Sequence, residues 1–231
     1  MFSMSPHDAT SEKSPPARVG LAGTRGKQQR ASLIGAARDL AAASGDASFT
    51  VDQVVERSGL SLKTFYRHFA GKDGLLLALV EDDCHRGSAI LLARMDGSDD
   101  AIERLRRFVA GFFAMVTVGS GYASLLVREH LHLQERHPIE LQRALAPLLE
   151  LLTAELSDGM RAGVVRAGDA HRDAVVVFNL VLAHIHAVVL GQLDDDMDAA
   201  AEHLWGFCRA ALEPRRSSKR TQSGRKRRQD P

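Results

Sequence analysis

Apolar residues recur at intervals of three and four positions along nearly the whole chain, which is the period of an amphipathic α-helix. The first such segment contains Leu33, Ile34 and Ala37 and stops at Gly45, so a helix is predicted over about residues 26–44. The alternating segments and hairpin dipeptides that are typical of β-strands are nearly absent. The pattern therefore predicts an all-α protein of about nine helices.

Further helices are predicted along the rest of the chain. One opens at residues 75–80, a second covers about residues 102–116, and a third begins with Pro138, a residue that suits the first turn of a helix. The last two are predicted over residues 170–191 and 196–212. Flanking segments 1–22 and 214–231 are polar and charged, and both are predicted to be disordered.

The most informative stretch follows the first helix. Thr50 and Gln53 have the spacing of a capping box, which starts a short helix, and Gly59 ends it because glycine tolerates the left-handed backbone of a sharp turn. Ser61 then caps a second helix of less than two turns, residues 62–68. Two short helices joined by such a turn are typical of a helix-turn-helix, whose second helix enters the major groove of DNA.

This second helix has an apolar side and a polar side. Leu62, Phe65 and Phe69 are predicted to point into a small core. Lys63 and Thr64, in the first turn, are placed to reach base edges, and the other polar residues nearby are better placed for phosphates. The predicted DNA contacts are Arg25, Lys27, Thr50, Ser61, Lys63, Thr64, Tyr66, Arg67, His68 and Lys72.

Charge is distributed unevenly along the chain and supports this interpretation. Residues 18–73 hold nine basic and five acidic residues, whereas residues 74–213 hold twelve basic and twenty-one acidic. The tail from residue 214 has eight basic residues against one acidic. Both ends therefore favour a polyanion such as DNA. The tail is equally compatible with a nonspecific DNA arm and with a solubilising terminus.

The stretch resembles the DNA-binding domain of the TetR family of transcriptional regulators, over roughly residues 27–80. Lys63 stands where that family often has glycine, so an unusual base preference is expected. Aromatic, basic and glycine positions carry the resemblance, in the segments Phe49-Thr50-Val51, Ser58-Gly59-Leu60-Ser61, Thr64-Phe65-Tyr66-Arg67-His68-Phe69 and Lys72-Asp73.

The resemblance implies a domain organisation and partners. Residues 23–72 would form the helix-turn-helix DNA-binding domain, and residues 73–213 a ligand-binding and dimerisation domain. Members of the family are typically homodimers on operator DNA, here through the helices 170–191 and 196–212. The apolar residues expected to form this interface are Val177, Leu180, Val181, His184, Val188, Leu204, Trp205 and Cys208.

The resemblance also implies a ligand pocket among the central helices. Its apolar lining would suit a hydrophobic effector such as a drug, a fatty or steroid-like acid, or a thioester of such an acid. Simple core packing is equally compatible with the aromatic positions, because pockets of this kind are lined by core side chains. The candidate ligand contacts are Phe108, Phe112, Phe113, Met115, Tyr122, Leu126, Arg128, His130, Phe178 and His184.

Other function classes find less support in the sequence. His130 and His132 are two positions apart, as are His184 and His186, and this spacing puts the imidazoles on different sides of a helix and disfavours a metal site. No catalytic residues and no cofactor are indicated. The alternatives are a helical metal-dependent enzyme and a dimeric interaction module without DNA binding.

A cytoplasmic location is expected. No continuous apolar run reaches the roughly 20 residues that a membrane span needs, and the first twenty residues lack the apolar core of a signal peptide. The two cysteines, Cys84 and Cys208, are too far apart in the sequence for a metal-binding pair and are expected to be buried in helices.

Overall fold

The computed structural model describes residues 19–45, 47–117, 120–194 and 196–214. Within these ranges the chain forms nine α-helices and no strand, which confirms the all-α prediction. The helices are α1 (Val19–Ser44), α2 (Val51–Ser58), α3 (Leu62–His68), α4 (Lys72–Met95), α5 (Ala101–Thr117), α6 (Ser120–Arg136), α7 (Pro138–Arg161), α8 (Ala170–Val189) and α9 (Met197–Leu212).

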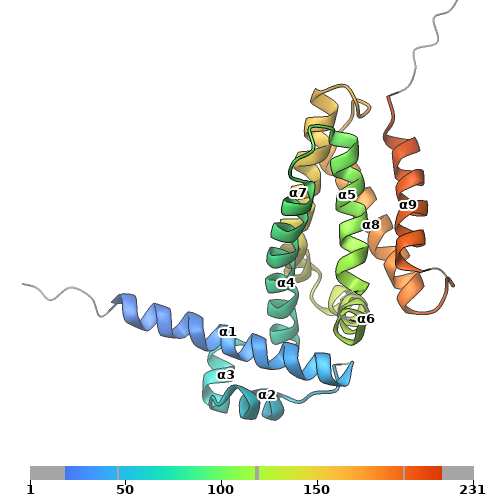
Figure 1. Cartoon of the computed structure of the whole chain (residues 1–231). Coiled ribbons are helices and arrows are strands. Elements are labelled where there is room, and N and C mark those ends of the chain that lie inside the picture. The colour runs from blue at the N-terminus through green and yellow to red at the C-terminus, as the bar shows by residue number, and fades with distance from the viewer. Residues whose placement is uncertain (1–18, 46, 118–119, 195, 215–231) are drawn as a thin grey trace, which may run out of the picture.

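The helices fall into a small unit and a larger body (Figure 1). α1 lies across the foot of the molecule with the short helices α2 and α3 beside it, and α4 rises from this unit into the body. In the body α4 packs on α7 and α5, while α9 packs on α5 and α8. α6 contacts α1 as well as α4, α7 and α8, so it lies between the small unit and the body.

The start of α1 and the presence of α6 differ in detail from the sequence prediction. α1 begins at Val19, seven residues before the expected start, so residues 19–22 are helical. α6 was not predicted individually, because its polar composition gives only a weak helical pattern. Residues 1–18 and 215–231, most of the two predicted disordered segments, lie outside the described residues.

Capping interactions fix the two short helices where the sequence predicts them. The Thr50 hydroxyl accepts from the backbone N–H of Gln53, and the Gln53 side chain accepts in return from the backbone N–H of Thr50, at 2.7 Å. Gly59 ends α2 in the left-handed region, with φ of 67°, where a side chain would be strained. Ser61 then caps α3 through the backbone N–H of Thr64.

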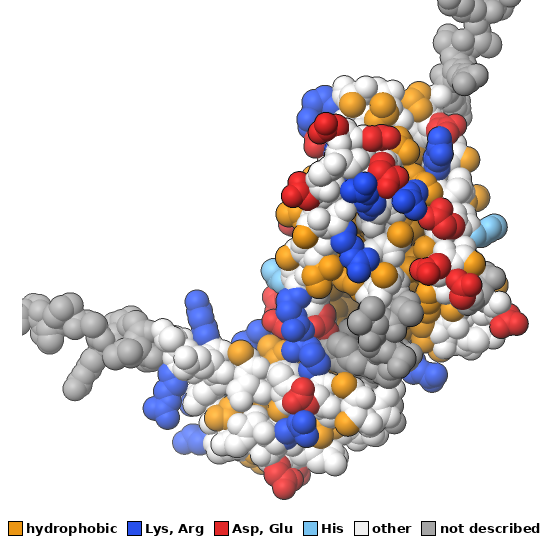
Figure 2. Space-filling view, viewed as in Figure 1, with side chains coloured by type: hydrophobic (Ala, Val, Ile, Leu, Met, Phe, Trp, Pro, Cys, Tyr) orange, Lys and Arg blue, Asp and Glu red, His pale blue; other side chains and the backbone are white. Residues whose placement is uncertain are grey.

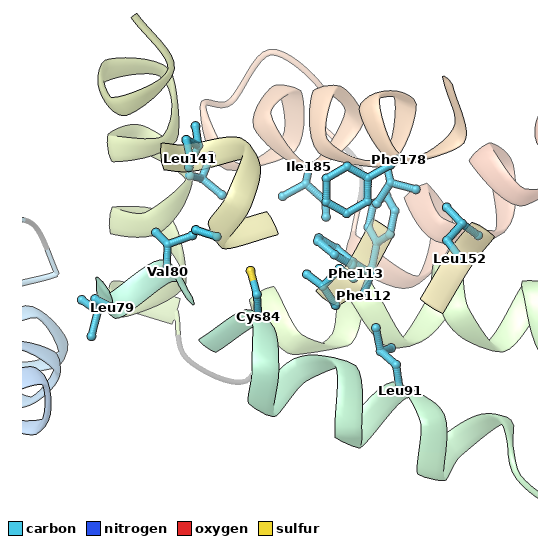
Figure 3. Packing of buried hydrophobic residues seen from close by; sticks show 14 of the residues in the cluster. Leu79, Val80, Cys84, Leu91, Phe112, Phe113, Leu141, Leu152, Phe178 and Ile185 are labelled. Carbon is cyan, nitrogen blue, oxygen red and sulfur yellow. The ribbon is translucent and has the colours of Figure 1, made fainter. Parts of the chain in front are cut away.

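A continuous hydrophobic core joins the small unit to the body through α4. Leu75 and Leu79, in the first half of α4, are fully buried, and Leu91 is fully buried near its end. In Figure 3 Leu79 lies on the side of α4 nearest the N-terminal helices, whereas Cys84 lies toward Phe112 of α5. One helix is therefore anchored in both parts of the molecule.

Candidate DNA-binding face, ligand cavity and dimer surface

α3 is held by its aromatic residues and exposes its polar ones. Phe65 is fully buried, and Phe69 is nearly so. Tyr66 lies edge-on to Phe65 with ring centroids 5.3 Å apart, yet it is 60% exposed. Lys63 is also exposed. The prediction for Leu62 was wrong, because its side chain is 43% exposed rather than in the core.

Several predicted DNA contacts surround this helix. Arg25 and Lys27 are exposed on α1, and Figure 2 shows Lys and Arg side chains around that helix. Arg67 is exposed on α3 and donates to the side-chain oxygen of Gln29 at 2.7 Å, so it is braced against α1. The hydroxyls of the caps Thr50 and Ser61 lie at the first turns of α2 and α3, and Thr64 contacts the Ser61 hydroxyl at 3.0 Å. Contact of these residues with DNA stays a prediction.

Lys72 and His68 have other surroundings than expected. The Lys72 ammonium donates to the carbonyl of Ala47 and lies 4.9 Å from the centre of the Phe49 ring, so it ties the α1–α2 loop to α4. His68 lines a groove between the small unit and the body, together with Glu81. Its Nε2 is buried without a hydrogen-bond partner among the described residues, and burial and nearby arginines lower its pKa. The exposed face of α3 includes neither side chain.

The body contains a cavity of about 450 Å³ between α4, α5, α6, α7 and α8. Most of its wall is apolar, with side chains such as Ile90 of α4, Val127 of α6 and Leu182 of α8. Gly87 belongs to the wall as well, and a Cβ at this position would lie 3.1 Å from the sulfur of Met115. The cavity is within the usual size range for small-molecule sites.

The predicted ligand residues divide between this cavity and the surrounding core. Phe112, Met115 and His130 line the cavity. Phe108, Phe113 and Phe178 are buried in the hydrophobic core and do not belong to the cavity lining. Arg128 is exposed, and His184 packs on Phe113 and on His203 instead. Tyr122 and Leu126 lie outside the residues whose side chains are described.

Sequence reasoning missed most polar residues of the cavity wall. Asp83, Arg86 and Arg94 come from α4, and His186 comes from α8. The helical pattern gave no signal for them, because they follow no recognisable motif and depend on which faces of α4 and α8 border the cavity. Cys84, next to Asp83, is buried, and burial together with the Asp83 charge raises its pKa to about 12.

Ion pairs connect the cavity wall to the small unit. Arg38 of α1 pairs with Asp82 at 2.7 Å and with Asp83 at 2.9 Å. Arg86 pairs with the same two carboxylates from its own helix. Asp83 and Arg86 also belong to the cavity wall, so this ion-pair cluster contacts both the cavity and α1.

A second polar cluster lies where α6 and α7 meet the first turn of α4. The Asp73 carboxylate lies 3.2 Å from Nε2 of His137, 3.4 Å from Nε of Arg136 and 3.8 Å from Nε2 of His132. α6 also carries His130 in the cavity wall. The start of α4, next to α3, is therefore held by the same helix that contacts the cavity.

The outer surface of α8 and α9 carries exposed apolar side chains among polar ones, but not at the residues expected from the sequence. Val177, Val181, Leu204, Trp205 and Cys208 are buried within the chain itself, so they are not available to a partner. The exposed apolar side chains are Val176, Leu190, Leu193 and Phe207, with exposed fractions of 57%, 40%, 38% and 63%. α8 is also the one helix among the described residues with the length and composition of a membrane span, and it packs against α5, α6, α7 and α9.

The small unit matches a known protein family. Residues 33–79 match the family model described as bacterial regulatory proteins, tetR family. The chain carries the helix-turn-helix domain of the TetR family. This result confirms the resemblance seen in the sequence. The matched residues include α2, α3 and the start of α4, residues 72–79.

Solved structures with the same fold include bacterial regulators. FadR, a fatty acid degradation regulator from Bacillus halodurans, is 20% identical with a TM-score of 0.65, over 79% of this chain and 98% of that one. FadR from Bacillus subtilis, in complex with stearoyl-CoA, is 18% identical with a TM-score of 0.62 and the same coverage. RolR, in complex with resorcinol, is 20% identical with a TM-score of 0.66, over 84% and 91%. No curated protein sequence gave a match.

Proposed function

We propose that this chain is a homodimeric, ligand-responsive repressor that leaves a palindromic operator when a small hydrophobic effector binds in the cavity. The observation that carries the proposal is the course of α4. Its first turns are buried with the helix-turn-helix, through Leu75 and Leu79, and later residues such as Cys84 and Ile90 line the cavity. A cytoplasmic location is part of the proposal.

The exposed face of α3 supports the DNA-binding step. A short helix that is anchored by Phe65 and presents Lys63, Tyr66 and Arg67 outward has the form of a recognition helix in the major groove. Lys63 lies in its first turn, which is the part of such helices that contacts base edges. In a dimer, two such helices would reach half-sites about one turn of DNA apart, which is why a palindromic operator is expected.

The apolar outer surface of α8 and α9 supports the homodimer. Val176 and Phe207 are large apolar side chains that are more than half exposed in the single chain. Exposed apolar side chains on two helices that pack against each other are typical of a site of association. Pairing of α8 and α9 with the same helices of a second copy would cover this surface by a twofold contact.

The cavity and the ion pairs of α4 support regulation by a ligand. FadR and RolR are seen with stearoyl-CoA and resorcinol, so proteins of this fold bind a long-chain acyl thioester and a small phenol. A ligand shifts an equilibrium between two states only by the difference in its affinity for them. Displacement of Asp83 or Arg86 by a ligand would loosen the contact to Arg38 of α1, and this would favour the state that leaves DNA.

The proposal is tested with DNA from the promoter region of the chain's own gene. We expect Lys63→Ala with Tyr66→Ala to abolish the gel shift, whereas Arg161→Ala, which removes an exposed charge at the far end of α7, leaves it unchanged. Affinity of the unaltered protein should fall about a thousandfold or more between about 50 and 200 mM salt, given six or more phosphate contacts.

The same experiment tests the alternative of an interaction module without DNA binding. A protein that is dimeric in solution and shifts no promoter fragment at low salt would be an interaction module. Unchanged DNA binding in the double variant would overturn the assignment of α3 as the recognition helix.

A further inference from the structure

Two histidines of the cavity wall each have a ring nitrogen without a hydrogen-bond partner among the described residues. His130 of α6 and His186 of α8 both line the cavity, and their ring centroids lie 5.3 Å apart. Nδ1 of His130 and Nε2 of His186 are buried and have no hydrogen-bond partner among the residues that the structure describes. Buried polar atoms are normally hydrogen-bonded, so a pair of unpartnered nitrogens at one place in a cavity points to a bound group that completes them.

The charged residues of the cavity wall do not supply the missing hydrogen bonds of the two imidazoles. Arg86 is paired with Asp82 and Asp83, and Asp83 is paired in addition with Arg38. Arg94 is exposed. The rest of the lining is predominantly apolar, which leaves the two imidazoles as the buried polar groups without an internal partner.

Both imidazoles are neutral near pH 7. Burial lowers the pKa of His130 to about 4, with a smaller contribution from His186, and burial also lowers the pKa of His186. A neutral imidazole has one N–H donor and one acceptor nitrogen. A hydroxyl group can donate to one such ring and accept from the other. A carboxylate can only accept, and its charge would lose its hydration in a predominantly apolar wall beside two uncharged rings.

We propose that the effector is an apolar alcohol or phenol whose uncharged hydroxyl group is bound between His130 and His186. The inference rests on the proposed function, since it names the chemistry of the ligand in the same cavity. The apolar wall binds the hydrocarbon part, and the two histidines select for the hydroxyl. A hydrocarbon of the same shape leaves both nitrogens unpaired, and a site built to hydrogen-bond a hydroxyl discriminates against a ligand that lacks it.

The test compares three probes with the same ring system, which are naphthalene, 2-naphthol and 2-naphthoate. Binding to the full-length protein is measured by calorimetry near pH 7 in two buffers of different ionisation enthalpy. We expect 2-naphthol to bind at least about tenfold more tightly than either other probe, because its hydroxyl makes two hydrogen bonds that each contribute a modest net amount. Its binding should take up no protons, because both imidazoles remain neutral.

Two variants assign the preference to the histidines. In His130→Phe with His186→Leu, the preference for 2-naphthol over naphthalene should disappear while naphthalene still binds. The matched control is His171→Ala, because His171 lies on the same helix as His186 but is exposed, and the preference should persist there. Naphthalene binding also shows that the double variant is folded.

Four outcomes would overturn the inference. They are equal binding of naphthalene and 2-naphthol, tightest binding of 2-naphthoate, a hydroxyl preference that survives in the double variant, and failure of all three probes to bind. None of them touches the proposed DNA binding, because the gel shift is measured without any probe. A protein that shifts its promoter fragment but shows one of these outcomes keeps the regulatory role and loses only this ligand chemistry.

Discussion

The helix-turn-helix unit, α1–α3, and the helical body, α4–α9, place their functional side chains in opposite directions. In α3 the polar residues Lys63 and Tyr66 are exposed, and the buried Phe65 holds them in position. In the body the polar residues His130 and His186 line an internal cavity. If these side chains bind DNA and a ligand as proposed, stability and binding should be separable in the small unit, whereas in the body the same residues should affect both.

The sharpest test of this difference is a pair of adjacent residues on α3. Phe65→Ala should lower the free energy of unfolding by about 3–5 kcal/mol, because the ring is fully buried. Tyr66→Ala should lower it by only about 1 kcal/mol, because Tyr66 is mostly exposed and loses one edge-on contact with Phe65, and yet weaken DNA binding. Urea unfolding and gel shifts measure the two effects. Equal losses of stability in both variants would contradict the division of α3 into an anchoring and a reading side.

A comparison of two ion pairs tests the same contrast between the body and the small unit. Arg104 of α5 donates through Nε to Glu155 of α7 at 2.7 Å, and Glu155 is the one buried charged residue among those described. Arg104→Ala leaves this carboxylate buried without its partner and should cost about 3 kcal/mol. Arg57 pairs with Asp39 at 3.3 Å between two side chains that are about half exposed, so Arg57→Ala should cost less than about 1 kcal/mol. Thermal unfolding compares the two variants, and similar shifts in Tm would remove the contrast.

A smaller effect is expected from pH. The pKa of His130 is about 4 in the folded chain and near 6.5 when the residue is exposed, so the unfolded chain binds the proton more readily. The stability contributed by the neutral imidazole is complete above about pH 6.5 and is lost as the pH falls toward 4. Between about pH 7.5 and 5 this loss should be on the order of 1–2 kcal/mol.

The measurement is the free energy of unfolding in urea at both pH values. In His130→Phe the decline with falling pH should be smaller by that amount, and His171→Ala should retain the decline of the unaltered protein. A decline of equal size in His130→Phe would show that other groups account for it.

The sequence was sufficient for the small unit because its signals are local. Thr50 with Gln53, Gly59 and Ser61 fix the ends of two short helices through contacts within three residues, and the family resemblance covers the same segment. Even there, the surroundings of Lys72 could not be predicted, since they depend on Ala47, which lies 25 positions away.

The cavity could be predicted only in part because its wall is assembled from five helices. Phe112, Met115 and His130 were expected to contact a ligand and do line the cavity, whereas Phe108 and Phe113 lie in the packed core beside it. An amphipathic pattern identifies which face of a helix is buried. It does not distinguish a buried face that meets another helix from one that meets a cavity, so this distinction requires the packed structure.

The bond between Lys72 and Ala47 connects the start of α4 to the loop before α2. Lys72 begins α4, and its contact with the loop before α2 couples that loop to any rotation of the long helix. α4 has 24 residues and is therefore about 36 Å long. If α4 tilts by about 5° about its C-terminal end, its N-terminal end next to α3 is displaced by about 3 Å. This displacement is about the length of a hydrogen bond, so it would be enough to break a hydrogen bond between a side chain of α3 and a base edge.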